Sequence, residues 1–380
     1  MPQQSIAITS FASISPLGNS IDDVWSSYLS EKSAINHQPL LTADLSEQSQ
    51  VQVNRIAREN KKYKALDKTV LYSLYTARQA FEQSGWRNDS TIGINIGSSR
   101  GATELFEKYH TLFVEQQRAE TLTSPTTTLG NISSWLAHDL QVNGPVISHS
   151  ITCASALHGF LNGIAWINAG MADKFIVGGS EAANTPFTVA QMQALNIYSR
   201  QTGVYPCRSL DFEKKENTMV LGEGATAFCI EAMSNTPHIA KIIGYGYATE
   251  QVNHNASIST NADCFQKSMQ MALSGHDLDN IDAIIMHAPG TIKGDQSELN
   301  AIRKVFGNQV PALTSNKWKL GHALGASGGL SVEMAILMLQ HQTLVESPFY
   351  KNEKQPNQLN SILVNAVGFG GNAVSLLVSK

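Results

Sequence analysis

Three side chains that can do covalent and hydrogen-bonding chemistry lie at the ends of predicted strands. Cys153, His287 and His322 each come at or shortly after the end of an apolar stretch. A thiolate can form a thioester with an acyl group, and a neutral imidazole can donate a hydrogen bond to a developing enolate oxygen. Taken singly, a cysteine after a strand is more often a small buried hydrophobe, and a histidine more often has a structural role. The elements around them decide whether the three side chains can meet.

The stretch around Cys153 has the pattern of a strand that passes directly into a helix. Residues 146–152 are largely apolar and β-branched, which predicts a buried strand, and residues 154–169 carry Ala, Gly and Leu at helical spacing. The turn between them puts the sulfur at a helix N-terminus, where backbone N–H groups and the helix dipole favour thiolate. We therefore expect Cys153 to be a nucleophile if suitable partners lie nearby.

The predicted elements repeat in the same order, which indicates an internal duplication. Strands are predicted at 6–10, 91–97, 146–152, 174–179 and 219–231, and again at 239–246, 281–287, 312–316, 361–367 and 373–379. Helices are predicted at 21–29, 69–84, 129–139 and 154–169, and again at 259–274 and 330–341. We expect an α/β protein with two halves, residues 1–238 carrying the cysteine and residues 239–380 carrying both histidines. If the halves pack about a pseudo-twofold axis, the three strand ends converge on one site.

The composition excludes several classes of function. The chain of 380 residues is 42% hydrophobic and 15% charged with a net charge of −4, so nothing global indicates a nucleic-acid partner. No N-terminal segment has the pattern of a signal peptide and no run approaches the roughly 18 apolar residues of a membrane span, so we expect a cytoplasmic protein without a membrane partner. The four cysteines, Cys153, Cys207, Cys229 and Cys264, show no CxxC spacing, which predicts neither a metal site nor a disulfide framework.

The most basic stretch of the chain is NRIARENKKYK, at residues 54–64. Such a run is usually a solvated face of a protein. The alternative is that Arg58, Lys61 and Lys62 dock an acidic partner. The sequence leaves both interpretations open.

Several motifs, in order and at compatible spacing, give the chain a resemblance to a known family. They are IAITSFASISPLGNSIDDVW near the start, SITCASALHG around Cys153, VGGSEA at 177–182, VLGEGA at 220–225, HAPGTIKGDQSE, TSNKWKLGHALGASGG and the closing NAVGFGGNAVSLLV. The chain is similar to the β-ketoacyl-[acyl carrier protein] synthases of the decarboxylating Cys-His-His type, in the thiolase-like superfamily. The resemblance implies a duplicated αβαβα layered sandwich whose two halves are related by a pseudo-twofold axis.

The resemblance also implies a mechanism. Cys153 would accept an acyl chain from the 4′-phosphopantetheine arm of an acyl carrier protein, and His287 and His322 would hold the thioester carbonyl of a malonyl donor while it loses carbon dioxide. The resulting carbanion would attack the acyl-cysteine and give a 3-oxoacyl thioester longer by one two-carbon unit. No tightly bound cofactor is implied, because the arm enters on the carrier protein. The implied partners are the carrier protein and a second ketosynthase-like chain, in a homodimer or a heterodimer.

Further residues match family positions around this chemistry. The GFGG loop makes the backbone N–H of Phe369, together with that of Cys153, the implied oxyanion hole, and it makes the Phe369 ring a candidate gate on the acyl pocket. Lys317 matches the lysine that steadies the histidine region, and Thr291 offers the hydroxyl that remains for the pantetheine arm. The family's supporting acidic pair corresponds to Asp295 and Glu298.

The chain departs from the family pattern close to the implied site. Ala288 and Pro289 follow the first histidine where the family usually has Gly-Thr, and Ser331 stands where a glutamate normally pairs with the lysine. Glu333 lies two positions further on, roughly 200° round a helix, so we expect that it does not replace that glutamate. The other departures are Glu216-Asn217-Thr218 in place of Arg-Asp-Gly, and Asn372 in place of threonine after GFGG. They indicate a divergent branch with an unusual acyl chain, in fatty-acid, polyketide or, as we favour, aryl-polyene or pigment synthesis.

Other functions compete with this interpretation. A non-catalytic partner subunit of the chain-length-factor type usually lacks the nucleophile, whereas Cys153 is present together with both histidines and Lys317. A degradative thiolase or a Cys-His-Asn condensing enzyme would need asparagine at His322. A Cys-His hydrolase would need a water path to the acyl-enzyme, which the small residues behind the cysteine disfavour. A purely structural protein would not need three reactive residues at the ends of strands. The chain-length factor is therefore the main alternative.

Overall fold

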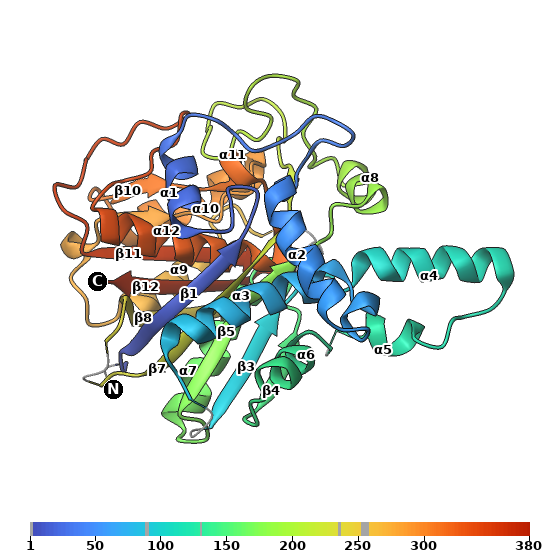
Figure 1. Ribbon diagram of the computed structural model, residues 1–380. Helices are drawn as coiled ribbons and strands as arrows, with labels where there is room; N and C mark the ends of the chain where they lie inside the picture. Colours follow the sequence, from blue (N-terminus) through green and yellow to red (C-terminus); the bar gives the residue numbers. More distant parts are fainter. Residues whose placement is uncertain (1–2, 88–90, 130, 235–236, 252–257) are drawn as a thin grey trace.

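The computed structural model describes residues 3–87, 91–129, 131–234, 237–251 and 258–380. In these residues ten strands form one mixed sheet at the centre of the molecule (Figure 1). In sheet order they are β10 (Ala312–Thr314), β9 (Ala283–Ile285), β11 (Ser361–Gly368), β12 (Asn372–Ser379), β8 (Ala240–Thr249), β1 (Ile6–Ile14), β7 (Gly224–Ala232), β5 (Lys174–Glu181), β3 (Ile92–Gly97) and β4 (Val146–His149). A separate parallel pair joins β2 (Thr42–Ala43) to β6 (Leu221–Gly222).

The two ends of this sheet repeat one topology. Reading outward from the middle, the order β1-β7-β5-β3-β4 matches the order β8-β12-β11-β9-β10. In both sets the two inner pairings are antiparallel and the two outer pairings are parallel. The sets meet where Ile6 to Ile8 pair with Ala240 to Ile242. The predicted duplicated α/β fold is therefore confirmed, and we propose that its halves are residues 1–238, with the cysteine, and 239–380, with both histidines.

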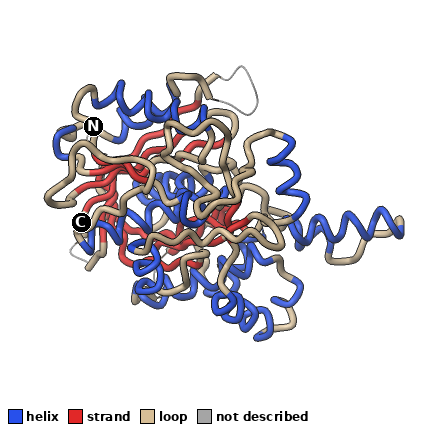
Figure 2. Tube along the Cα trace, turned by 90° about the horizontal axis from the view of Figure 1, so that it is seen from above, coloured by secondary structure: helices blue, strands red, loops and turns tan. Residues whose placement is uncertain are grey.

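Helices add three layers to the two sets of strands, so that in Figure 2 they surround and separate the strands. On the outer face of the first set lie α3 (Lys68–Ser84), α2 (Glu47–Glu59) and α6 (Asn131–Leu140). Between the sets lie α7 (Ser155–Asn168) and α12 (Ser327–His341), which contact each other and strands of both halves. The outer face of the second set is covered by α9 (Asp263–Ala272) and α10 (Ile292–Phe306).

The core follows these layers. The central apolar cluster joins Leu157 and Phe160 of α7 to Leu330 and Met334 of α12, and two further clusters lie under the outer helices. Every residue of α12 from Ser327 to Leu339 is buried. A helix that is apolar or small on all its faces can only be buried, which is why this segment forms the centre of the molecule.

Local signals set several helix boundaries as predicted. The first helix, α1 (Ile21–Leu29), begins after Ser20, whose hydroxyl accepts the N–H of Asp23 at 3.2 Å. The next long helix, α3, begins after Asp67, whose carboxylate accepts the N–H of Thr69 at 2.8 Å, and it ends at Gly85 with φ of 64°. The remaining short elements are η1 (Tyr63–Ala65), η2 (Leu278–Asn280), α11 (Lys317–Leu320) and η3 (Leu324–Ala326).

One helix extends away from the body of the molecule. It is α4 (Thr103–Gln116), which is followed by α5 (Thr123–Thr127), and Figures 1 and 2 both show it projecting. The only side chain of α4 that is buried is that of Thr103, so the helix has no core-facing apolar stripe for sequence analysis to detect. The α-helices of the described residues that the sequence did not predict are α2, α4, α5, α8 (Pro186–Ala194), α10 and α11.

The environment of β4 differs from the prediction. The stretch before Cys153 is apolar enough to predict a buried strand, but β4 ends at His149 and its side chains are half-buried or exposed, with Val146 at 41%. The reason is its place in the fold, since β4 is the last strand of the sheet and pairs with β3 on one side. An apolar edge strand gains full burial only when a further chain covers it.

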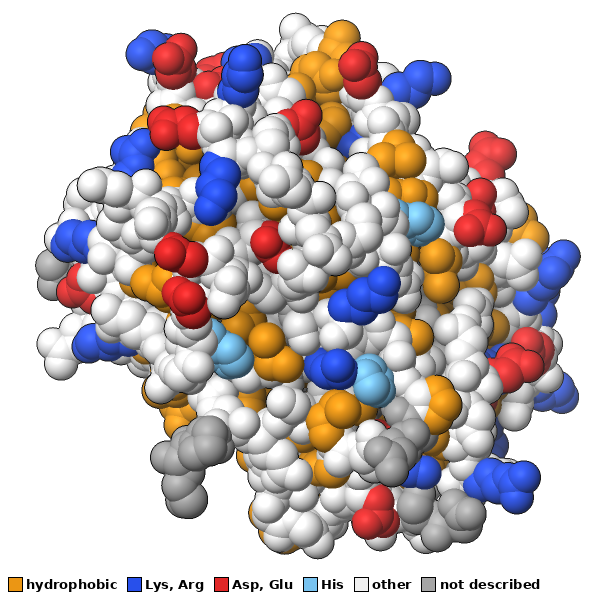
Figure 3. Space-filling view, turned by 90° about the vertical axis from the view of Figure 1, so that its left-hand side faces the viewer, with side chains coloured by type: hydrophobic (Ala, Val, Ile, Leu, Met, Phe, Trp, Pro, Cys, Tyr) orange, Lys and Arg blue, Asp and Glu red, His pale blue; other side chains and the backbone are white. Residues whose placement is uncertain are grey.

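The surface shows no strong segregation of charge on the face away from α4. Figure 3 shows acidic and basic side chains interspersed there with small apolar groups. Among the residues that the structure describes, no helix is long and apolar enough to cross a membrane.

Candidate active site

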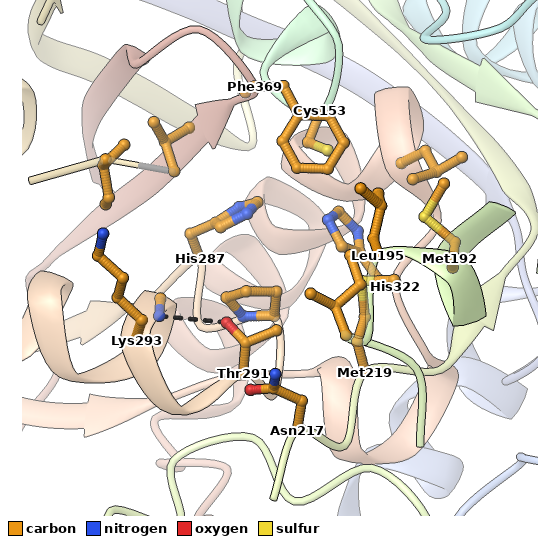
Figure 4. Close-up of a pocket in the computed structure, with 17 residues that line it drawn as sticks. Cys153, Met192, Leu195, Asn217, Met219, His287, Thr291, Lys293, His322 and Phe369 are labelled. Atoms are coloured by element: carbon orange, nitrogen blue, oxygen red, sulfur yellow. Dashed lines mark hydrogen bonds between the residues drawn. The ribbon is translucent and has the colours of Figure 1, made fainter. Parts of the chain in front are cut away.

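Cys153, His287, His322 and Phe369 line one cavity of about 300 Å³. Figure 4 shows Cys153 and Phe369 at the top of the view, the two histidines below them and Asn217 at the bottom. The predicted convergence of the three strand ends therefore holds in the structure. The other lining residues are mostly apolar and come from both halves of the chain: Met192, Leu195, Ile197, Met219, Ile258, Pro289, Thr291, Lys293, Gly294, Leu324, Val367 and Gly368.

Cys153 follows a strained turn between β4 and α7. Thr152 has φ of 47°, in the left-handed region that a β-branched residue rarely adopts. Ser155 restrains the turn, because its hydroxyl accepts the N–H of Ile151 at 2.9 Å and donates to the carbonyl of Thr152 at 2.6 Å. A Cβ at Gly368 would lie 1.9 Å from Thr152 Oγ1, so glycine allows the C-terminal loop to approach the turn. These contacts fix the position of the sulfur.

The resting Cys153 side chain is a thiol. Its exposed fraction is 5%, and burial raises the pKa of the thiol to about 12, with a smaller rise from the carboxyl of Glu181 and a partial opposing effect of the Lys317 ammonium. The sequence indicates a helix N-terminus that favours thiolate, and burial of the sulfur opposes that effect. Desolvation of the sulfur outweighs the helix dipole, so acyl transfer must remove the thiol proton to a base.

His322 is held by its own loop. It is 2% exposed, and its backbone N–H donates to the carbonyl of Val220 at 2.7 Å. The ring Nδ1 lies 2.7 Å from the hydroxyl of Ser327, which leaves Nε2 for a substrate. Directly before it, Gly321 has φ of 70° and a Cβ there would lie 2.9 Å from the carbonyl of Leu221, so this turn also needs glycine.

His287 is positioned by a buried carboxyl. Glu298 of α10 accepts the backbone N–H groups of His287 and Ala288, both at 2.9 Å, and the side-chain amide of Asn365 at 3.2 Å. The ring of His287 packs against that of His322 with centroids 5.1 Å apart and planes at 81°. Its Nδ1 is buried and has no hydrogen-bond partner among the described residues.

Both imidazoles are neutral at physiological pH. Burial, with a smaller contribution from the Lys317 ammonium, lowers the pKa of His322 to about 3. Burial lowers the pKa of His287 well below its usual value, and His322 and Lys317 add to that shift. A neutral imidazole can donate one hydrogen bond to a substrate oxygen and can accept a proton, so the pair suits stabilisation of an enolate rather than of a carboxylate.

Lys317, at the start of α11, is buried beside these groups. Its exposed fraction is 1%, and Nζ donates to Asn316 Oδ1 at 3.1 Å and lies 3.5 Å from Ser331 Oγ. Burial lowers its pKa to about 8, against opposing effects from Glu298 and other groups. No carboxylate of the described residues forms an ion pair with it. Glu333 instead accepts a hydrogen bond from Ser13, so it does not take the place of the missing glutamate, as expected.

The structure adds Glu181, which sequence analysis did not assign. Its buried carboxyl accepts the N–H groups of Ser99, Arg100 and Gly325 and the hydroxyl of Ser98, at 2.7–3.2 Å. It thereby ties the end of β5 to the loop after β3 and to the loop that follows His322. Burial raises its pKa to about 7. The only sequence feature that includes Glu181 is the VGGSEA motif, and that motif does not by itself indicate a role for the carboxyl.

The remaining predicted residues lie around the cavity. Thr291 lines it and caps α10, its hydroxyl accepting the N–H of Gly294 at 3.1 Å. Asp295 is buried behind the loop, where it accepts the N–H of Gly290 at 2.9 Å and pairs with Lys214 at 2.7 Å. The Phe369 side chain is 39% exposed and lies over Cys153 in Figure 4. Among the described residues, no group of three or more His, Cys, Asp or Glu side chains could hold a metal ion.

The basic segment at residues 54–64 lies outside the cavity. It forms the end of α2 and the turn η1, and the side chains of Arg58, Lys61 and Lys62 are exposed. Both interpretations of the segment require that exposure, so docking of an acidic partner stays a prediction.

Comparisons with known families agree with this geometry. The model of the β-ketoacyl synthase N-terminal domain matches residues 3–235, and that of the C-terminal domain matches residues 239–350. A 3-oxoacyl-[acyl-carrier-protein] synthase 2 of Coxiella burnetii is 28% identical, covering 100% of this chain and 99% of the relative. A 3-oxoacyl-[acyl-carrier-protein] synthase 1 of Buchnera aphidicola is 28% identical, with 99% of each chain covered.

Solved structures of low identity share the fold. The ishigamide ketosynthase/chain length factor superposes with a TM-score of 0.85 at 19% identity, covering 100% of this chain and 99% of the other. A ketosynthase in complex with its chain length factor from Xenorhabdus doucetiae gives 0.80 at 20% identity, with 99% and 98% covered. A type II polyketide synthase ketosynthase in complex with its acyl-carrier protein gives 0.86 at 17% identity, with 100% of each covered.

Proposed function

The chain belongs to the β-ketoacyl synthase family, and from that membership we propose that it catalyses a decarboxylative Claisen condensation on Cys153. An acyl thioester on this cysteine reacts with malonyl-[acyl carrier protein] and gives a 3-oxoacyl-carrier protein longer by one two-carbon unit. The observation that carries the proposal is the meeting of a buried thiol with two neutral imidazoles in one largely apolar cavity.

In the first half-reaction the Cys153 sulfur attacks the thioester carbonyl of an acyl-carrier protein. The thiol proton passes to a neutral imidazole and then to the departing pantetheine thiol, so that one thioester replaces another. The oxygen that becomes negative in the tetrahedral intermediate accepts hydrogen bonds from the backbone N–H groups of Cys153 and Phe369. The proposal assigns the Phe369 ring, which is partly exposed beside the sulfur, as the gate between the cavity and the acyl chain.

In the second half-reaction the two histidines hold the donor. Nε2 of His287 and of His322 donate hydrogen bonds to the malonyl thioester oxygen while the carbon–carbon bond to the carboxylate breaks and carbon dioxide leaves. We assign the Ser327 hydroxyl as the donor to His322 Nδ1, 2.7 Å away, and this assignment puts the ring proton on Nε2. The enolate carbon then attacks the acyl-cysteine carbonyl, the sulfur leaves as thiolate, and it takes up one proton from solvent, the proton that the overall reaction consumes.

The substrates match the lining of the cavity in chemical character. Met192, Leu195, Ile197 and Met219 offer an apolar surface, and Thr291 offers a hydroxyl at the side where the pantetheine arm would enter. No tightly bound cofactor is part of the proposal, because 4′-phosphopantetheine arrives on the carrier protein. One of the solved structures with this fold is a ketosynthase in complex with its acyl-carrier protein, which supports that partner. The departures from the family pattern favour a specialised polyene-type or polyketide-type chain over primary fatty-acid synthesis.

The test is a condensation assay with purified protein, a panel of acyl-carrier proteins and malonyl-carrier protein. We expect a 3-oxoacyl-carrier protein, detected as its mass, for at least one acyl chain, and an acyl mass on the protein when malonyl-carrier protein is omitted. A chain-length-factor-like subunit is the alternative, favoured by the two solved structures with this fold that contain such a factor. That alternative predicts no acyl mass on this chain and condensation only after a second synthase is added.

We propose in addition that a second ketosynthase-fold chain, in the simplest case a copy of this one, binds along β4 and α4. Three observations support this surface. The edge strand β4 pairs with β3 on one side, and Val146 on it is 41% exposed. The projecting α4 exposes Phe106 at 61%, Phe113 at 46% and Val114 at 58%. Exposed apolar groups and an open strand edge are each typical of a surface that another chain covers.

The double change Phe106→Asp and Phe113→Asp is expected to convert the dimer to a monomer, because it puts two charges into the apolar contact. Light scattering coupled to size-exclusion chromatography measures the mass. The matched control is Met271→Asp, a change at another exposed apolar side chain, on α9. Persistence of the dimer in the double variant would remove α4 from the interface, and a monomeric native chain would indicate that the partner is a different chain.

A further inference from the structure

The buried Lys317 ammonium is held by neutral groups. Asn316 Oδ1 accepts from Nζ at 3.1 Å, Ser331 Oγ lies at 3.5 Å, and no ion pair with a carboxylate of the described residues is formed. A buried ammonium without a paired carboxylate bears most of its desolvation cost, so its protonated form is less favoured than that of an exposed lysine. The hydrogen-bond partners of Nζ therefore decide up to which pH the Lys317 amine stays protonated.

The acidic group with the largest effect on the lysine is not free to pair with it. The Glu298 carboxyl is the first group that favours the charged form of Lys317. Both of its oxygens, however, accept hydrogen bonds from the backbone N–H groups of His287 and Ala288 and from Asn365. Moving it toward the lysine would leave those donors buried without partners.

A second buried carboxyl, that of Glu333, is linked to the lysine through the neutral side chains of Tyr28 and Asn316. Glu333 is 1% exposed, accepts from Ser13 at one oxygen, and has no partner for the other among the described residues. Its carboxylate is close enough to raise the pKa of the buried Tyr28 phenol. The hydroxyl of Tyr28 in turn accepts from Asn316 Nδ2 at 3.5 Å. A line of buried polar groups thus runs from Glu333 through Tyr28 and Asn316 to Lys317.

We propose that Asn316, oriented by Tyr28, is a positioning residue that together with Ser331 anchors the Lys317 ammonium in place of an ion pair, so that donor decarboxylation depends on pH through the charge of this lysine. The inference rests on the proposed condensation and concerns its second half-reaction. With neutral partners, the charge of Lys317 changes with pH, and the electrostatic potential at the two histidines changes with it. A carboxylate in the place of Asn316 would keep the ammonium charged over a wider pH range.

The charge matters because Lys317 acts on both imidazoles. Its ammonium contributes to the low pKa of His287 and of His322, which keeps both rings neutral and able to donate one hydrogen bond each. It also favours the negative charge that develops on the thioester oxygen. The titratable and charged groups that face it are Glu298, Cys207, Cys153, Asp295, His287 and His322.

The sign of the pH dependence follows from the direction of the shift. Burial lowers the pKa of Lys317 to about 8, so the ammonium is present below that pH and is lost as the pH rises through it. Decarboxylation should therefore fall on the alkaline side, about tenfold for each pH unit above the midpoint. A carboxylate next to Nζ would favour the ammonium and move the midpoint upward.

The test uses full-length protein with Cys153→Gln, which can decarboxylate malonyl-carrier protein but cannot be acylated, and follows carbon dioxide release over a pH series. The added change Asn316→Asp puts a carboxylate 3.1 Å from Nζ without a change of size. We expect it to move the alkaline midpoint upward by about one pH unit or more. Tyr28→Phe should lower kcat and leave KM unchanged, since it frees Asn316 without touching the donor. The matched control is Asn162→Asp, a half-buried amide of α7 that hydrogen-bonds Asn95 at 2.8 Å.

The outcomes separate the inference from the proposed function. No decarboxylation by the Cys153→Gln protein at any pH would overturn the condensation itself. Decarboxylation with the same alkaline midpoint in the presence and absence of Asn316→Asp would overturn only the neutral anchor. Thermal unfolding by circular dichroism identifies a variant that fails to fold, and Ser331→Asp then serves as the second way to bring a carboxylate to Nζ.

Discussion

Cys153→Ala is expected to abolish the acyl mass that an acyl-carrier protein leaves on the intact protein, and to lower condensation on the order of 10⁴-fold or more. The reason is that the methyl group of alanine cannot form a thioester. The other three cysteines are fully or almost fully buried and do not line the cavity, so none can take over. Intact-protein mass spectrometry after incubation with acyl-carrier protein measures the acyl mass directly.

The matched control for this variant is Cys229→Ala. Cys229 is buried in β7 within the apolar cluster of the first half, so this change tests a cysteine of similar burial without chemistry. It should keep the acyl mass and lose only a modest part of the stability. An acyl mass that survives in Cys153→Ala but disappears after a change at another cysteine would contradict the assignment of the nucleophile.

The site could be predicted because its reactive residues follow the ends of strands. The apolar stretches before Cys153, His287 and His322 are recognisable one at a time, and the repeated order of elements brings their ends together. Capping residues such as Ser20 and Asp67 similarly fix helix starts through local hydrogen bonds. These features depend on residues that are close together in the sequence, so they can be recognised without the structure.

What could not be predicted depends on contacts between distant segments. The charge state of the thiol is one example, since local sequence favours thiolate while burial by both halves raises the pKa to about 12. The role of Glu181 is another, because its four donors come from loops more than 80 positions before it and 144 positions after it. The projecting α4 was missed for the opposite reason, since it packs few of its side chains within this chain.

Buried carboxyls also explain why the cavity tolerates departures from the family pattern. Pro289 interrupts the loop after His287, yet Asp295 and Glu298 still hold that loop through the N–H groups of Gly290 and Ala288. The backbone positions are fixed by buried carboxyls, so the side chains between them are free to differ. The sequence of the loop can therefore change with the donor or acyl chain while the imidazole stays in place.

The second large effect concerns the donor step. Cys153→Gln alone should decarboxylate malonyl-carrier protein without condensing it, because glutamine leaves the histidines intact but cannot hold an acyl group. Adding His287→Ala to that protein is expected to lower the decarboxylation rate about 10²–10³-fold, since one of the two donors to the developing enolate oxygen is lost. The conversion of malonyl-carrier to acetyl-carrier protein, followed by mass, measures this rate.

His37→Ala in the same Cys153→Gln protein is the matched control, because His37 is an exposed histidine of the loop after α1, outside the proposed partner surface, and does not line the cavity. It should leave decarboxylation unchanged. Removal of the His287 ring also opens space beside His322, whose ring centroid lies 5.1 Å away, so thermal unfolding and the KM for malonyl-carrier protein are measured as well. A lower kcat at unchanged KM and stability is the signature of a lost transition-state donor. Equal rates with and without His287 would mean that the imidazoles do not hold the donor thioester.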